Sequence, residues 1–113
     1  MELANDQSQP EIARASAVKA MANYDIQNNI NAYIALLNDN APLVRGATLD
    51  VLGELNTMDF MANLLPLLND PKRSIRIKAF YALGSVPEYQ IPNEYKNAYE
   101  KVSKEFETYL KIN

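Results

Sequence analysis

The sequence predicts an all-α fold, an α-solenoid in which short helix pairs stack and a long C-terminal helix caps the last pair. Three observations support this expectation: a pattern that recurs every 31 residues, apolar side chains at helical spacing on both sides of a short Asn-Asp turn, and the lack of strand-like alternation. A single helix pair leaves part of its apolar surface uncovered, and stacking of successive pairs buries that surface. We therefore expect the 113 residues to form one repeat domain.

The recurring pattern is clearest between residues 34–55, IALLNDNAPLVRGATLDVLGEL, and residues 65–86, LPLLNDPKRSIRIKAFYALGSV. Leucines, Asn-Asp, an arginine and Leu-Gly return at the same offsets. A further step of 31 residues back from Arg45 leads to Arg14, in a partial copy whose turn aspartate, Asp6, is two residues out of step. The expected divisions are a half repeat over 3–24, full repeats over 26–55 and 59–86, and a C-terminal helix over 93–112.

Both helices of each full repeat have one apolar stripe. The first helices carry Ile26, Ile30, Tyr33, Ile34 and Leu37 in one repeat, and Phe60, Leu64, Leu65 and Leu68 in the next. The second helices carry Val44, Thr48, Val51, Leu52 and Leu55, then Ile75, Ala79, Ala82, Leu83 and Val86. Proline is tolerated in a first helical turn, and Pro10, Pro42 and Pro71 are expected in that position.

The last element follows a connection that Pro87 and Pro92 make irregular. Asn93 is a suitable N-cap for the helix after it. This helix has an aromatic stripe, formed by Tyr95, Tyr99, Val102, Phe106 and Tyr109. The stripe either covers the last repeat as a cap or serves as a docking face for a following domain.

The composition excludes several classes of chemistry. The chain has no cysteine and no histidine, so disulfides, Cys/His metal sites and Ser-His or Cys-His catalytic pairs are ruled out. Its three glycines do not form a phosphate-binding loop. We therefore predict no catalytic residues, no cofactor and no metal site.

The charge balance bears on the kind of partner. Eleven basic and 14 acidic residues give a net charge of -3, which disfavours a general nucleic-acid binder. No apolar stretch is long enough to span a membrane, so we expect neither nucleic acid nor membrane as a partner. Composition alone does not determine the compartment.

The pattern of leucines, Asn-Asp, proline, Val/Ile-Arg, a small residue and Leu-Gly resembles HEAT repeats of the short bacterial kind, over residues 3–86. In such repeats, aspartate and arginine form a ladder between neighbouring units. The resemblance implies a structural ladder of Arg14, Asp39, Arg45, Asp70 and Arg76. An alternative interpretation is that the three arginines form an anion-binding row. We favour the ladder, because each full-repeat arginine has an aspartate in the preceding turn.

Second helices commonly line the binding face of an α-solenoid, so their positions outside the core are candidates for partner binding. The candidates are Lys19, Asp50, Ile77, Lys78 and Tyr81. Ile77 and Tyr81 are apolar and aromatic residues outside the core stripe, so the stripe does not account for them. They either bind a partner or contact the final helix.

A narrower resemblance covers LANDQSQPEIARASAVKAM, the two full repeats and the EYKNAYEKVSKEFETYLKIN helix. These segments resemble the HEAT segment of bacterial proteins that join multihaem cytochrome c motifs to tetratricopeptide repeats. The resemblance implies a periplasmic or extracytoplasmic scaffold excised from a larger chain, without haem ligands of its own.

We therefore expect a non-catalytic scaffold that binds a protein partner or neighbouring domains of its own chain. The alternative is a HEAT-like enzyme or nucleic-acid-binding module, similar to DNA glycosylases or bilin lyases. The acidic net charge and the lack of tryptophan and cysteine disfavour this alternative.

Overall fold

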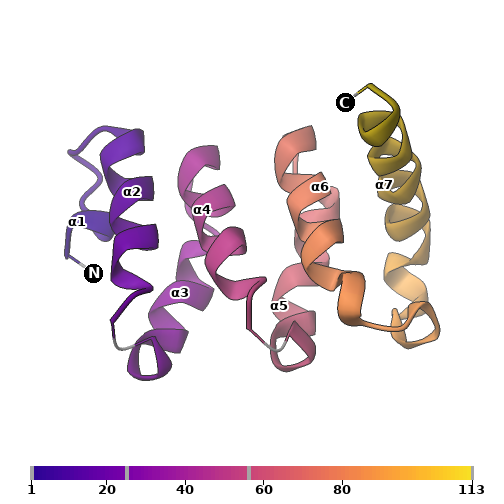
Figure 1. Ribbon diagram of the computed structural model, residues 1–113, viewed down its shortest axis with the longest axis horizontal. Coiled ribbons are helices and arrows are strands. Elements are labelled where there is room, and N and C mark those ends of the chain that lie inside the picture. The colour runs from indigo at the N-terminus through magenta and orange to yellow at the C-terminus, as the bar shows by residue number, and fades with distance from the viewer. Residues whose placement is uncertain (1, 25, 56, 113) are drawn as a thin grey trace. The chain divides into compact units, whose positions relative to one another are not determined.

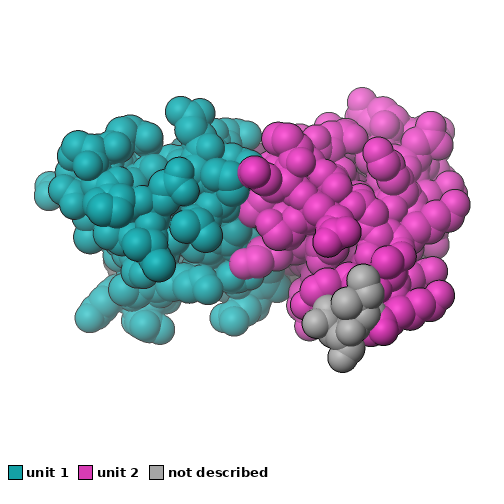
Figure 2. All heavy atoms as spheres, turned by 90° about the horizontal axis from the view of Figure 1, so that it is seen from above, with its two compact units in different colours: residues 1–55 teal, residues 56–113 magenta. Residues whose placement is uncertain are grey.

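The chain divides into two compact units, Met1–Leu55 and Asn56–Asn113, which Figure 2 shows in teal and magenta. The computed structural model describes residues 2–24, 26–55 and 57–112. Every regular element in these ranges is an α-helix or a 3-10 helix, and none of the described residues lies in a strand. The all-α helical repeat fold predicted from the sequence is confirmed.

Unit 1 packs its second helices against each other and places the first helix of the full repeat beneath them. Its elements are α1 (Glu2–Asn5), α2 (Glu11–Met21), the 3-10 turn η1 (Gln27–Asn29), α3 (Ile30–Leu36) and α4 (Pro42–Leu52). Helix α2 runs alongside α4, while α1 packs on α2 and α3 packs on α4 (Figure 1). The most deeply buried large side chains of this unit are Val18, Tyr33, Leu37, Val44, Leu49 and Leu52.

Helix α4 begins where the sequence predicts. The Asp39 carboxylate accepts a hydrogen bond from the Ala41 amide (2.9 Å), and Pro42 is the first helical residue, where its missing N–H has no intrahelical partner to lose. The other two prolines lie outside their helices. Pro10 directly precedes α2, and Pro71 lies two residues before α6 (Arg73–Ala82). The prediction that all three occupy a first helical turn is right only for Pro42.

Unit 2 is built from short helical segments and one long helix. Its elements are η2 (Thr57–Phe60), α5 (Met61–Leu64), η3 (Leu65–Asn69), α6, η4 (Leu83–Ser85), η5 (Glu88–Gln90) and α7 (Asn93–Ile112). Helix α6 packs on η3 and on α7, and α7 also contacts η3. The deeply buried side chains of this unit are Leu64, Leu65, Leu68, Ile75, Ala79, Leu83, Ile91 and Val102.

The first helix of each full repeat is less regular than its apolar stripe suggests. In unit 1 the α-helix starts at Ile30, after the 3-10 turn η1, although the stripe begins at Ile26. In unit 2 the expected helix from Phe60 to Leu68 is broken into η2, α5 and η3. Pro66 lies in η3 and has no N–H to continue the α-helical hydrogen bonds. The stripe of unit 2 is nevertheless buried at all four of its positions. In unit 1, Tyr33 and Leu37 are buried, whereas Ile26, Ile30 and Ile34 are half-buried.

Helix α7 is the longest element of the described chain and runs alongside α6 (Figure 1). Val102, at the middle of its aromatic stripe, is fully buried, and Tyr95, Tyr99 and Phe106 are half-buried. Tyr109 is 47% exposed near the C-terminal end. Most of the stripe therefore covers the rest of unit 2, and its last turn does not. No helix in the described ranges has the length and apolar character needed to cross a bilayer.

Candidate interaction site

Arg14 and Asp39 form a buried ion pair inside unit 1. Nη2 of Arg14 lies 2.5 Å from Oδ1 of Asp39 and Nη1 lies 3.2 Å from Oδ2, and the two side chains are only 3% and 6% exposed. Nε of Arg14 donates to the Ala4 carbonyl of α1 (3.0 Å). One guanidinium therefore connects α1, α2 and the turn before α4.

The other two ladder arginines bind the turn of their own repeat through its backbone. Nη1 of Arg45 donates to the Asp39 carbonyl (2.9 Å) and the Asn40 carbonyl (3.1 Å). Nη1 of Arg76 makes the same contact with the Asp70 carbonyl (2.9 Å). The predicted closeness of each arginine to the preceding aspartate is thus mediated by carbonyl oxygens, which tie the start of the second helix to the turn.

The aspartate carboxylates have a local role in the same turns. Asp39 and Asp70 each accept a hydrogen bond from the amide two residues later, that of Ala41 and that of Lys72, both at 2.9 Å. These are Asx turns, which orient the chain for the helix that follows. In the partial copy, Asp6 makes the same contact with the Ser8 amide (3.0 Å), in an exposed turn.

The carboxylate partner of Arg76 comes from outside the predicted ladder. Nε of Arg76 donates to Oε1 of Glu105 (3.0 Å) and Nη2 donates to Oε2 (2.7 Å). Glu105 lies on α7 and has no counterpart in the 31-residue pattern, so the repeat comparison could not identify it. In the sequence, the feature that points to Glu105 is its position directly before Phe106, at the edge of the apolar stripe that packs on unit 2.

The ion pairs favour the charged forms of Asp39, Glu105 and Arg76. At Asp39 burial opposes ionisation, but hydrogen bonds from Arg14, Ala41 and Gln7 outweigh it and lower the pKa of the carboxyl group. At Glu105 the hydrogen bonds from Arg76 lower the pKa, and the nearby charges of Lys101 and Arg73 act in the same direction. The pairing with Glu105 also raises the pKa of Arg76.

The partner-binding candidates of unit 1 are paired with each other. Nζ of Lys19, on α2, lies 3.1 Å from Oδ2 of Asp50, on α4, and the two side chains are 58% and 37% exposed. An exposed pair of this kind contributes little to stability.

The candidates of unit 2 lie on α6 next to α7. Tyr81 is 75% exposed, yet its ring lies 6.4 Å from that of Phe106, centroid to centroid. Ile77, one turn earlier, and Lys78 are half-buried. Tyr81 therefore contacts the final helix with one side and presents the other side to solvent, and partner binding at this surface stays a prediction.

Phe80 is the aromatic residue that the sequence analysis missed. Its ring lies 5.1 Å from Tyr99 and 5.3 Å from Phe106, in tilted arrangements that favour aromatic contact. Phe106 in turn stacks on Tyr109 at 6.3 Å. The sequence feature that points to Phe80 is its position next to Tyr81, because two adjacent aromatic residues place their rings on adjacent sides of one helix. Together these rings form an aromatic cluster of Phe80, Tyr81, Tyr99, Phe106 and Tyr109.

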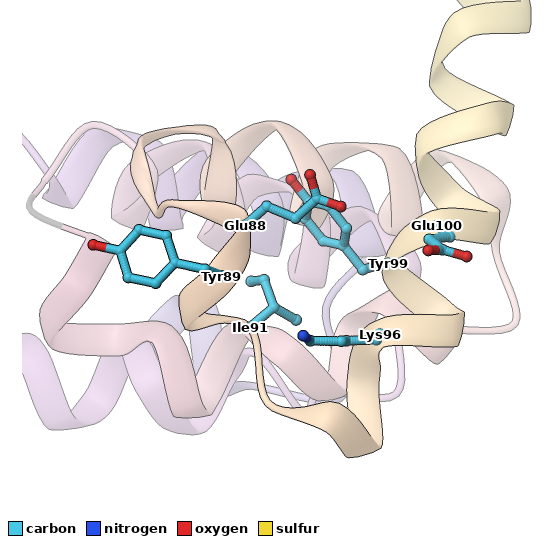
Figure 3. A pocket seen from close by; sticks show the side chains of 6 residues that line it. All are labelled: Glu88, Tyr89, Ile91, Lys96, Tyr99 and Glu100. Carbon is cyan, nitrogen blue, oxygen red and sulfur yellow. The ribbon is translucent and has the colours of Figure 1, made fainter.

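A pocket of about 360 Å³ lies between the 88–91 turn and the start of α7 (Figure 3). Its lining residues are Glu88, Tyr89, Ile91, Lys96, Tyr99 and Glu100. Figure 3 shows the Glu88 and Tyr99 side chains together, and the Tyr89 ring extending away from them. Burial and the charge of Glu88 raise the pKa of Tyr99. The pocket thus holds the Tyr99 phenol beside the Glu88 carboxylate.

Within residues 2–24, 26–55 and 57–112, no cluster of three or more acidic, histidine or cysteine side chains is placed to hold a metal ion. Comparison with curated proteins and comparison with solved structures each gave no match. A family model described as HEAT repeats matches residues 30–94, more than half of the chain. The matched residues include both full-repeat second helices, α4 and α6, with Arg45 and Arg76. The chain therefore belongs to the HEAT repeat family.

Proposed function

We propose that this protein is a non-catalytic scaffold that binds a protein partner, or a neighbouring domain of its own chain, through the aromatic cluster of unit 2. HEAT repeats generally serve as protein-interaction scaffolds and are typically non-catalytic. The observation that supports a particular surface is Tyr81, which is 75% exposed although it belongs to a cluster of packed rings.

An exposed tyrosine beside packed aromatic rings suits protein recognition. Tyrosine offers a large apolar area with few rotatable bonds and is enriched at the centres of protein interfaces. Contact with Phe106 restrains the Tyr81 ring before a partner arrives, so less side-chain entropy is lost on binding. The stacked Phe106 and Tyr109 rings extend this surface along α7.

The chain provides a matched control for this proposal. Tyr89 is 79% exposed, close to the value for Tyr81, but lies on the 88–91 turn, and no ring contact is found for it among the described residues. We would replace each tyrosine separately by the photo-crosslinking residue p-benzoyl-phenylalanine and express each variant in the source cells of the protein. Irradiation of these cells and mass spectrometry of the crosslinked products would then identify the bound protein.

A defined protein or neighbouring domain crosslinked from position 81 but not from position 89 is the expected result. Tyr81→Ser should then abolish co-purification of that partner, while Tyr89→Ser leaves it unchanged. Equal crosslinking from both positions, or loss of the partner in both serine variants, would contradict the assignment of the surface.

A narrower proposal concerns the context of the chain. The resemblance to segments that join multihaem cytochrome c motifs to tetratricopeptide repeats suggests a bacterial, extracytoplasmic scaffold between such modules. The test is the parent reading frame on either side of residues 1–113. Flanking CxxCH motifs or tetratricopeptide units would support the proposal, and unrelated flanking sequence would remove it.

A further inference from the structure

Arg14 of unit 1 and Arg76 of unit 2 occupy the same position of the repeat pattern, 62 residues apart. Each binds a carboxylate bidentately, and in each case that carboxylate comes from an element later in the chain. For Arg14 it is Asp39, in the turn of the next repeat. For Arg76 it is Glu105, in α7. Glu105 therefore fills the chemical role that a turn aspartate fills in unit 1.

The guanidinium of Arg76 is held in position to receive this carboxylate. Its Nη1 donates to the Asp70 carbonyl (2.9 Å), which leaves Nε and Nη2 as the edge that faces α7. Two parallel N–H to oxygen bonds between a guanidinium and a carboxylate define the orientation of both groups. The pair therefore sets the register of α7 on α6.

Apolar contacts next to the Arg76–Glu105 pair also hold α7 on α6. Phe106, next to Glu105, packs on Phe80 of α6 at 5.3 Å, and Val102 is 0% exposed. The HEAT match ends at residue 94, whereas α7 spans Asn93–Ile112. Nearly all of α7 thus lies outside the matched residues. It nevertheless packs on α6 and pairs with Arg76, as a following repeat would.

We propose that α7 terminates the repeat array by occupying the place of a further repeat on unit 2, with Glu105 substituting for the turn aspartate of that repeat. The helix covers the apolar face of α6 and η3 and uses the bidentate edge of Arg76. A repeat that lacks such a cover exposes a face able to accept another helix pair, including one from a second copy of this chain. Stacking of that kind is head-to-tail and does not close, so it leads to open assemblies.

The experiment compares two charge reversals on the same helix, Glu105→Lys and Glu107→Lys. Both change the net charge equally, but the Glu107 side chain is exposed, whereas Glu105 is paired with Arg76. Hydrogen exchange measures the opening of α7 relative to α6, and sedimentation velocity over a range of concentrations measures self-association.

We expect Glu105→Lys to accelerate amide exchange in α7 by about tenfold or more, with a much smaller change in α6, and to produce species that grow with concentration. Glu107→Lys should match the parent protein in both measurements. The same α7 exchange in the two variants would overturn the role of Glu105. Equal acceleration across unit 2 would overturn the view of α7 as a separate cover. Release of α7 without self-association, or equal self-association of the parent protein, would overturn the stacking step.

Amide exchange in α7 and self-association are measured without the partner, so they test the role of Glu105 separately from the partner surface proposed above. The partner surface includes Phe106 and Tyr109 of α7, so release of α7 in Glu105→Lys should also weaken crosslinking from position 81. Loss of crosslinking together with normal α7 exchange would remove only the partner surface.

Discussion

Arg76 of α6 donates two hydrogen bonds to Glu105 of α7, at 3.0 and 2.7 Å, while its remaining nitrogen binds the Asp70 carbonyl at 2.9 Å. A single guanidinium thus joins the turn before α6, α6 itself and the C-terminal helix. The equivalent residue of unit 1, Arg14, joins α1, α2 and the turn before α4 through Ala4 and Asp39. The same side chain therefore connects three elements in each unit.

Removal of either member of the Arg14–Asp39 pair should destabilise unit 1 strongly. Arg14→Ala leaves a carboxylate that is 6% exposed without its main partner, and loss of one member of a buried pair typically costs about 3–5 kcal/mol. Urea denaturation at neutral pH measures this loss. As a comparison, Lys19→Ala breaks an exposed pair and should cost less than about 1 kcal/mol. Equal losses in both variants would contradict the structural role of Arg14.

Arg45→Ala should lower the melting temperature without loss of partner binding. Arg45 is 9% exposed, and its Nη1 satisfies two carbonyl oxygens of the turn before α4, those of Asp39 and Asn40. The loss of these bonds should cost about 1–3 kcal/mol. Thermal denaturation and the crosslinking assay at position 81 measure the two properties. A variant of unchanged stability that no longer binds its partner would support an anion-binding or recognition role instead.

The stability of the protein should fall as the pH is lowered below about 5. Asp39 and Glu105 have pKa values below their ordinary values of 3.8 and 4.5, because each is hydrogen-bonded to an arginine. A depressed pKa contributes stability that is complete above the pKa of the unfolded chain and is lost as the pH falls through the pKa of the folded chain. Denaturation curves between pH 7 and pH 2 test the effect. Asp39→Asn should be less stable at neutral pH and lose less on acidification, so a parallel decline in both proteins would contradict the assignment.

Val102→Ala should destabilise unit 2, and Leu110→Ala should not. Both are apolar residues of α7, but Val102 is 0% exposed and Leu110 is 56% exposed. Removal of the buried methyl groups should cost about 1–3 kcal/mol, whereas the exposed substitution should stay within about 0.5 kcal/mol. Chemical denaturation with a probe in unit 2 distinguishes the two. Similar effects would mean that α7 does not dock through its central turn.

Gly84→Ala should raise the stability by about 0.4–1 kcal/mol. None of the described glycines has a positive φ, and a Cβ at Gly84 would meet nothing within 4 Å. Alanine therefore loses nothing in the folded state and restricts the unfolded chain. The difference in urea midpoint checks this. A lower stability of Gly84→Ala would contradict the prediction and would mean that glycine is required at this position for a reason other than steric space.

The sequence by itself determined the fold class and the buried side of most helices. Both follow from local spacing, because apolar residues three and four apart must share one face of a helix. It also placed Arg14, Arg45 and Arg76 at one repeat position. It did not reveal that the first helix of the second full repeat is divided into η2, α5 and η3, because a stripe of four apolar residues does not distinguish one continuous helix from successive short segments.

Only the tertiary structure decided which groups those positions contact. Periodicity identifies a face that must be covered but not the element that covers it. The partner of Arg76 lies 29 residues later on a helix outside the repeat pattern, and the ring partners of Tyr81 and Phe80 lie on the same helix. Such contacts depend on the register in which α7 packs on α6, and packing and hydrogen bonding between the two helices set that register.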